Sequence, residues 1–128
     1  MMTEEIKTVD TSVVFRIFDE NTDEELKNEI EQLLLKERVF IPCEVIIELS
    51  YLLKTRLRKT KREIIEIISR YFLRDNIELE PECLSALTLW ENSTLDKLVD
   101  ALILIKARER NCTLITLDKE MQKVYSNI

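Results

Sequence analysis

The sequence predicts an α/β fold, a single three-layer domain of residues 1–128 in which helices flank a central parallel sheet. The first observation is alternation: short apolar runs of three or four residues are separated by longer amphipathic segments. That order is typical of parallel strands joined by helical crossovers. The second is continuity, because the 128 residues contain no internal repeat, low-complexity tract or linker and are enough for one core.

Four apolar runs are predicted as strands, at residues 6–9, 38–41, 77–79 and 113–116. The first leads into Asp10, and the last ends just before Asp118. Pro42 closes the second run and suits the first turn of a following helix.

The segments between and after these runs have the apolar spacing of helices. The first is expected to be capped by Asp10 or Thr11. The helix at 81–91 is expected to bury Leu84, Leu87 and Trp90. The predicted helices are residues 11–18, 24–36, 43–57, 63–74, 81–91, 95–110 and 121–125.

The helix at 95–110 is apolar on nearly every side, which predicts a position in the interior. It nevertheless carries Asp96 and Asp100 one turn apart on the same face. Asn111, a residue that tolerates the left-handed conformation, ends it. A buried carboxylate is costly without a partner, and no basic residue is an obvious one for Asp100. This predicts a bound cation.

Composition excludes several kinds of chemistry. The chain has no histidine, which removes histidine bases, Ser-His-Asp triads and His-ligated zinc sites. It has no glycine, which removes the P-loop and the GxGxxG fingerprint. The formal net charge of −6 does not by itself indicate a nucleic-acid binder.

Cys43, Cys83 and Cys112 form no CxxC pair and are predicted as reduced core residues of a cytoplasmic protein. No run is as long as a membrane span, and residues 1–10 lack the pattern of a signal peptide. Residues 54–62 carry six basic side chains, which predict a phosphate-binding rim, a solvated turn or part of a homodimer surface.

Four carboxylates are placed where a parallel sheet binds ligands, beyond the carboxyl ends of its strands. Asp10 and Asp118 follow strands, Asp100 precedes one, and Glu48 lies on the helix after the second. Such oxygen ligands favour Mg²⁺ or Mn²⁺. A divalent ion lowers the pKa of a bound water, orients a phosphodiester and stabilises the leaving oxygen.

Each carboxylate also has a purely structural interpretation. Asp10 and Asp118 are suited to cap the helices that follow them. Asp96 completes an S-x-x-D capping box with Ser93. Glu48 is consistent with a partly exposed helical residue. The four carboxylates together, rather than any one of them, favour a metal site.

Three motifs carry a family resemblance: VDTSVV at 9–14, EVIIELSYLL at 44–53 and VDALILIKARERNCTLITLDKEM at 99–121. With them the chain resembles the PIN-domain nucleases and, among these, the VapC-like toxins of prokaryotic toxin–antitoxin pairs. The resemblance implies strand order 3-2-1-4-5, although no run after Asp118 predicts the fifth strand. Asn111 stands where the family usually has glycine.

The resemblance also implies a Mg²⁺- or Mn²⁺-dependent ribonuclease whose metal ligands are Asp10, Glu48, Asp100 and Asp118. Thr11 and Thr116 are expected to orient these carboxylates as hydroxyl partners, and Asp96 to lie beside them. The expected partners are an RNA substrate, a second copy of the chain in a homodimer and a small antitoxin, with no membrane.

Two other functions remain open. The first is a PIN-fold scaffold or RNA-binding protein without turnover. The second is a phosphotransfer domain like a response-regulator receiver, which needs a phosphoacceptor Asp at the end of a central strand. Neither the run at 38–41 nor that at 77–79 ends in one, so this function is disfavoured.

Overall fold

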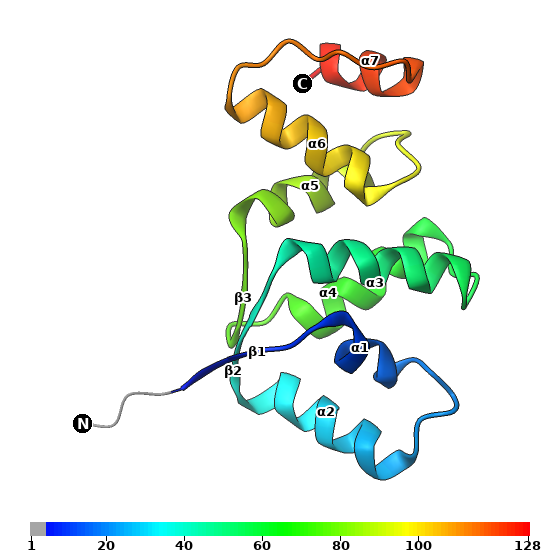
Figure 1. The fold of residues 1–128 in the computed structure, drawn as a ribbon, viewed down its shortest axis with the longest axis vertical. Coiled ribbons are helices and arrows are strands. Elements are labelled where there is room, and N and C mark those ends of the chain that lie inside the picture. Colours follow the sequence, from blue (N-terminus) through cyan, green and yellow to red (C-terminus); the bar gives the residue numbers. More distant parts are fainter. Residues whose placement is uncertain (1–4) are drawn as a thin grey trace. The chain divides into compact units, whose positions relative to one another are not determined.

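The structure is a computed structural model that describes residues 5–128. It divides the chain into two compact units, the first ending at Glu80 and the second running from Pro81 to Ile128. Figure 1 shows the elements of each unit.

The first unit contains a parallel sheet of three strands, β1 (Ile6–Thr8), β2 (Arg38–Ile41) and β3 (Ile77–Leu79), in the order β1-β2-β3 (Figure 1). Lys7 pairs with Val39 across the first strand pair, and Phe40 with Glu78 across the second. On the central strand, Val39 and Ile41 are almost completely buried. The α/β class, the parallel pairing and the first three strands are confirmed.

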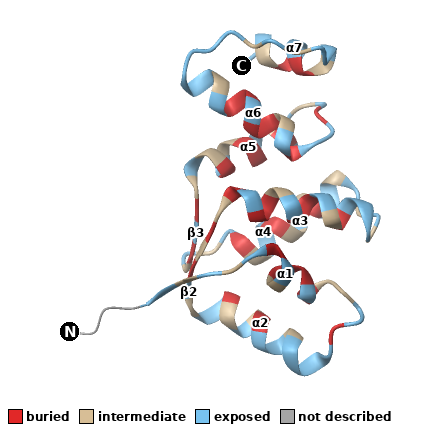
Figure 2. Ribbon diagram, viewed as in Figure 1, coloured by how far each residue is buried: buried red, intermediate tan, exposed pale blue. Residues whose placement is uncertain are grey.

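The helices of this unit are α1 (Thr11–Val14), the 3₁₀ helix η1 (Phe15–Ile17), α2 (Glu24–Lys36), α3 (Cys43–Thr55) and α4 (Lys61–Phe72). They flank the sheet and meet in one core, coloured as buried in Figure 2. Helix α2 has the predicted bounds, whereas α3 and α4 each end two residues early. The largest fully buried side chains of the unit are Leu34, Ile41, Ile46, Leu49, Leu53, Ile64, Ile68 and Phe72.

The start of α3 is completed by a side chain far away in the sequence, whereas the start of α4 is completed by its own residues. The N-cap of α3 is Pro42, which supplies no capping side chain. Instead Glu80, at the end of β3, accepts the Cys43 N–H at 2.9 Å. Helix α4 carries its own capping box, in which Thr60 and Glu63 bond reciprocally. These contacts fix where α3 and α4 begin.

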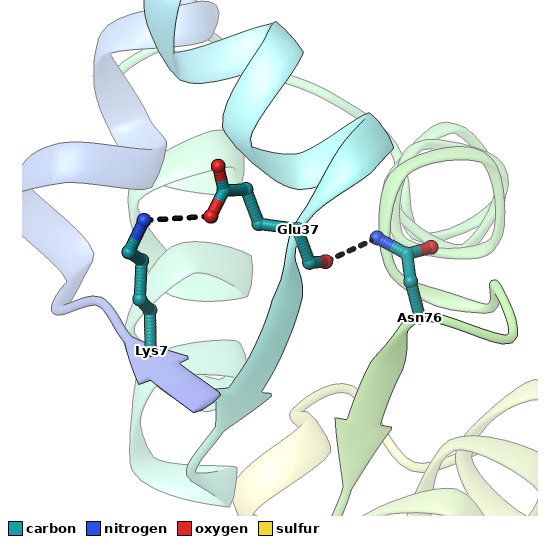
Figure 3. Close-up of polar contacts among 3 residues, drawn as sticks. All are labelled: Lys7, Glu37 and Asn76. Atoms are coloured by element: carbon teal, nitrogen blue, oxygen red, sulfur yellow. Dashed lines mark hydrogen bonds and ion pairs between the residues drawn. The ribbon is translucent and has the colours of Figure 1, made fainter. Parts of the chain in front are cut away.

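The amino end of the sheet is joined by three polar side chains (Figure 3). Lys7 on β1 pairs with Glu37, the residue that ends α2, at 2.6 Å. The carboxylate of Glu37 raises the pKa of Lys7 by accepting this bond. Asn76, just before β3, donates its amide to the carbonyls of Leu34 at 2.9 Å and Glu37 at 2.7 Å. Two carbonyls at the end of α2 are therefore satisfied by one side chain.

Replacing Asn76 with alanine should lower the free energy of unfolding by about 1–3 kcal/mol, because two part-buried carbonyls lose their donor. Asn76→Asp should cost at least as much, since it puts an acceptor where a donor is needed. The control is Asn92→Ala, which removes one exposed bond at the end of a helix and should stay within about 0.5 kcal/mol. Urea unfolding measures all three, and equal costs at both positions would contradict the prediction.

The second unit consists of α5 (Pro81–Glu91), α6 (Leu98–Glu109) and α7 (Lys119–Ser126). Helices α5 and α6 pack against each other, and Lys106 pairs with Glu82 across them at 3.9 Å. Asn111 has φ 54°, as predicted, and the N–H of Cys112 bonds back to Ala107. The core of this unit is Cys83, Ala86, Leu87, Trp90, Leu95, Leu98, Ala101, Leu102, Leu104, Ile105, Met121 and Val124.

The predicted strand at 113–116 is wrong: within the described residues this segment belongs to no sheet. Within it Ile115 is 90% exposed, whereas Leu114 and Thr116 are partly buried; Leu117, the residue after the segment, is 101% exposed. β-branched residues form a strand only where a neighbouring backbone pairs with them. Here Tyr125 donates to the Cys112 carbonyl at 2.6 Å and Gln122 to the Thr116 carbonyl at 2.7 Å, so side chains of α7 hold the connection. The order 3-2-1 is observed, without the fourth strand.

Three predictions about burial also need correction. Helix α6 is not covered on every side, because Val99 and Ile103 are exposed. Leu84 on α5 is exposed as well, although it was assigned to the core. Cys43 and Cys83 are buried as predicted, but Cys112 is exposed. No helix within residues 5–128 has both the length and the apolar character that a membrane crossing requires.

Candidate metal site

Asp10 lies just beyond β1, in the extended conformation that places it as the N-cap of α1. Its Oδ1 accepts the Val13 N–H at 3.3 Å and the Ser12 hydroxyl at 2.5 Å. The Ser12 bond is the main reason why the pKa of Asp10 is lowered, so this carboxylate is held ionised. The hydroxyl that bonds to Asp10 is therefore that of Ser12, which has no sequence signal of its own, whereas Thr11 is buried.

Glu48 projects from the middle of α3 and is exposed. The buried side of the helix is formed by its neighbours Val45, Ile46 and Leu49. Glu48 therefore lies on the solvent side of α3 and not on the inner face to which Val45 belongs. Helix α1, which Asp10 caps, packs against α3 within the same unit.

Asp100 is half-buried in the first turn of α6. Its pKa is raised, first by burial and next by the negative charge of Asp118. Lys97 lowers that pKa, and Asp96 raises it. An Asp held partly out of water beside other carboxylates is stabilised by a cation.

Asp118 is the N-cap of α7, and the strand expected directly before it is not formed within the described residues. Its Oδ1 accepts the N–H groups of Glu120 at 2.9 Å and Met121 at 3.1 Å. The Thr116 hydroxyl accepts the backbone N–H of Asp118 at 3.0 Å, so this bond reaches the main chain of Asp118 and not its carboxylate. Capping and metal binding are compatible, because both capping bonds use the same oxygen.

The predicted Ser93–Asp96 capping box does not start α6. That helix begins at Leu98, with Lys97 as its N-cap and no capping side chain. The Ser93 hydroxyl accepts the Leu95 N–H at 3.3 Å. Asp96 is exposed, and its charge acts on Asp100 one turn later. The helix thus starts later than the capping pattern predicts, and Leu95 and Leu98 are both buried there.

The candidate residues fall into two sets. Asp10 and Glu48 belong to the first unit, and Asp96, Asp100 and Asp118 to the second. Across residues 5–128, neither unit on its own gathers three or more acidic or cysteine side chains in a metal-binding group. Carboxylate oxygens are nevertheless the donors that Mg²⁺ and Mn²⁺ prefer, and the raised pKa of Asp100 beside Asp118 is the electrostatic condition that a cation relieves.

Two surface hollows lie elsewhere. One of about 550 Å³ runs along α2 and is lined by residues that include Glu25, Glu29 and Lys36. The other, of about 420 Å³, lies beside α5 and α6 and includes Leu84 and Arg108 in its lining. Neither is lined by any of the four predicted metal ligands. They do not indicate a small-molecule site at the strand-end acids.

No curated protein is similar to this chain in sequence. The sequence profile of the PIN domain, in contrast, matches residues 7–127. This range includes the motifs around Asp10, Glu48, Asp100 and Asp118 and covers almost all of both units. The chain therefore belongs to the PIN domain family.

Proposed function

We propose that this chain is a metal-dependent endoribonuclease, the toxin of a toxin–antitoxin pair. Membership of the PIN domain family, a superfamily of nucleases, supports a nuclease-type function. The observation that carries the proposal is the half-buried Asp100, whose pKa is raised by burial and by Asp118. Carboxylates with shifted pKa values are more common at functional sites than elsewhere.

Mg²⁺ or Mn²⁺ would be held by Asp10, Glu48, Asp100 and Asp118. A bound divalent ion supplies an activated water and stabilises the leaving oxygen of a phosphodiester. The hydrogen bond from Ser12 keeps Asp10 ionised, and the first N–H groups of α7 fix the orientation of Asp118. Partial burial of Asp100 strengthens its attraction for a cation, because water screens that charge less.

The proposal includes two protein partners, a second copy of the chain in a homodimer and a small antitoxin that covers the acidic residues. Both rest on the resemblance of the motifs at 9–14, 44–53 and 99–121 to VapC-like toxins. Sedimentation at several protein concentrations tests the homodimer.

A PIN-fold scaffold or RNA-binding protein without turnover is the second candidate. It is favoured by the capping bonds of Asp10 and Asp118, which give both residues a structural reason to be present. The two functions differ in metal binding, because a cap needs no cation. Calorimetry with divalent ions therefore separates them.

We expect saturable binding of Mg²⁺ or Mn²⁺ to the wild type and its loss in the double variant Asp10→Asn/Asp118→Asn. The matched control is Asp23→Asn, which alters an acidic N-cap of the same kind, on α2, outside the proposed site. Its binding should equal that of the wild type. If the wild type binds neither ion, or if the double variant binds as well as the wild type, the proposed metal site is refuted. The four acids are then only helix caps and surface residues.

A further inference from the structure

The connection between α3 and α4 is the most basic part of the chain. Residues 54–62, called the basic turn below, contain Lys54, Arg56, Arg58, Lys59, Lys61 and Arg62. No acidic residue occurs from 49 to 62, although the whole chain carries a formal charge of −6. Most of the turn is exposed (Figure 2). A local positive field of this kind, on a chain with a negative net charge, attracts polyanions.

The basic turn has a defined backbone. Arg58 adopts φ 56°, a left-handed conformation that costs a non-glycine residue about 1 kcal/mol or more. The next N–H, of Lys59, bonds back to the Leu53 carbonyl at 3.0 Å, and the Thr60–Glu63 capping box starts α4 directly afterwards. Arg56 stacks over the ring of Phe15 in η1, 5.9 Å from its centre. The basic side chains therefore project from a turn whose backbone conformation is fixed.

One exposed aromatic residue adjoins the turn. Tyr51 lies one helical turn before it on α3, with 60% of its surface exposed. The Thr55 hydroxyl donates a hydrogen bond to the Tyr51 carbonyl at 2.8 Å. Lys54 lies three residues after Tyr51, on the same side of the helix. An exposed ring beside basic side chains is the combination with which proteins bind single-stranded nucleic acid, by stacking bases and neutralising phosphates.

We propose that the basic turn and Tyr51 form a binding surface for single-stranded RNA. The identity of the polymer rests on the proposed nuclease function; the charge and the aromatic ring are properties of the turn itself. Glu48 lies on the same helix, eight residues before Arg56, which is about 12 Å along its axis. A strand held at the turn is therefore close to one of the proposed metal ligands.

An acidic protein partner is less well supported. Stable protein interfaces have an apolar centre, but Tyr51 is the only large apolar side chain that is exposed within residues 51–62. Leu53 is fully buried, and Leu52 and Leu57 are partly buried. The surface thus offers charge, hydroxyl groups and one ring, which match phosphates and a base.

The test measures the anisotropy of a fluorescein-labelled 12-nucleotide oligouridine with the full chain, in EDTA so that no cleavage occurs. The variant is Arg58→Gly/Lys59→Gln, in which glycine suits the observed φ and should preserve or improve stability. We expect affinity to fall about tenfold at low salt, and the slope of log K against log salt to decrease by roughly 1 to 2. Tyr51→Ala should weaken binding about five- to a hundredfold and leave the slope unchanged.

The control is Arg70→Gln/Lys123→Gln, which removes two exposed positive charges outside the turn. A smaller loss of affinity in this control than in the turn variant would show that RNA binding depends on where the positive charges lie rather than on the net charge. The proposal is overturned if the turn variant binds as the wild type does, or if polyglutamate of equal length competes as well as RNA. It is also overturned if the variant's only defect is lost self-association in sedimentation.

Failure of this inference differs from failure of the proposed function. The turn variant should still bind Mg²⁺ or Mn²⁺ in calorimetry, because none of its substitutions touches a proposed ligand. Turn-dependent RNA binding without any cleavage would refute the nuclease and keep the binding surface. Metal-dependent cleavage that is equal in the wild type and the turn variant would refute the binding surface and keep the nuclease.

Discussion

Asp100→Asn is expected to reduce metal-dependent RNA cleavage at least about 100-fold, since it removes a charged metal ligand. The same substitution should make the metal-free protein more stable at neutral pH. Burial and the charge of Asp118 raise the pKa of Asp100, so the ionised form is disfavoured in the folded state. Asparagine has nearly the same shape and no charge, and therefore removes that cost.

The pH dependence of this gain follows from the direction of the shift. A raised pKa means that the folded state holds the Asp100 proton more tightly than the unfolded state does. The advantage of the variant should be near zero below the ordinary pKa of Asp, grow as pH rises through the raised pKa, and stay constant above it. Because Asp100 is only partly buried, we expect a plateau of a few tenths to about 1 kcal/mol.

Thermal unfolding between pH 3 and 8 in EDTA measures the stability, and fluorescent RNA with Mn²⁺ measures the cleavage. Asp75→Asn is the control, because it alters an exposed carboxylate outside the proposed site. It should change neither property. A variant at Asp100 that cleaves as well as the wild type would refute the proposed role, and one that is less stable at pH 7 would refute the electrostatic argument.

Most of the fold could be predicted because the relevant signals are local. The apolar spacing of residues 24–36 defines α2 completely, and the runs at 38–41 and 77–79 define β2 and β3. Asn111 ends α6 because asparagine tolerates a positive φ. The type of this one residue is therefore enough to predict the end of the helix. Such features depend on a few neighbouring residues.

The segment at 113–116 could not be predicted in the same way. Thr113, Ile115 and Thr116 have the side chains of a strand, but strand formation requires a partner that accepts the backbone hydrogen bonds. The exposed Leu84, Val99 and Ile103 show the same limit for helices. An apolar pattern identifies which side chains are able to be buried and does not identify what covers them.

The candidate site depends even more on tertiary contacts. The sequence indicates Asp10 and Asp118 through their positions after predicted strands, and the structure adds the bonds that orient them. Ser12 was missed because a hydroxyl two residues from an Asp is common and carries no signal of its own. The pKa of Asp100 is raised first by burial and next by the charge of Asp118, eighteen positions further along, and both causes depend on tertiary packing.

Truncating a buried side chain in each unit should have the largest effect on stability. Phe72 is fully buried in the first unit, and Phe72→Ala should lower the free energy of unfolding by about 3–5 kcal/mol. Leu104 is fully buried in the second unit, and Leu104→Ala should lower it by about 2–5 kcal/mol. We propose that residues 1–128 unfold as one cooperative domain, as the sequence predicts. Each substitution should then shift a single transition of the whole chain.

The chain offers a local reporter for this prediction, because Trp90, its one tryptophan, is buried in α5 of the second unit. In one domain, Phe72→Ala must lower the midpoint that Trp90 fluorescence detects as much as the midpoint that circular dichroism detects for all helices. Phe72→Leu serves as the control and should shift both midpoints less, since it leaves a smaller cavity. If the units unfold separately, Phe72→Ala will leave the Trp90 transition in place and split the dichroism curve in two.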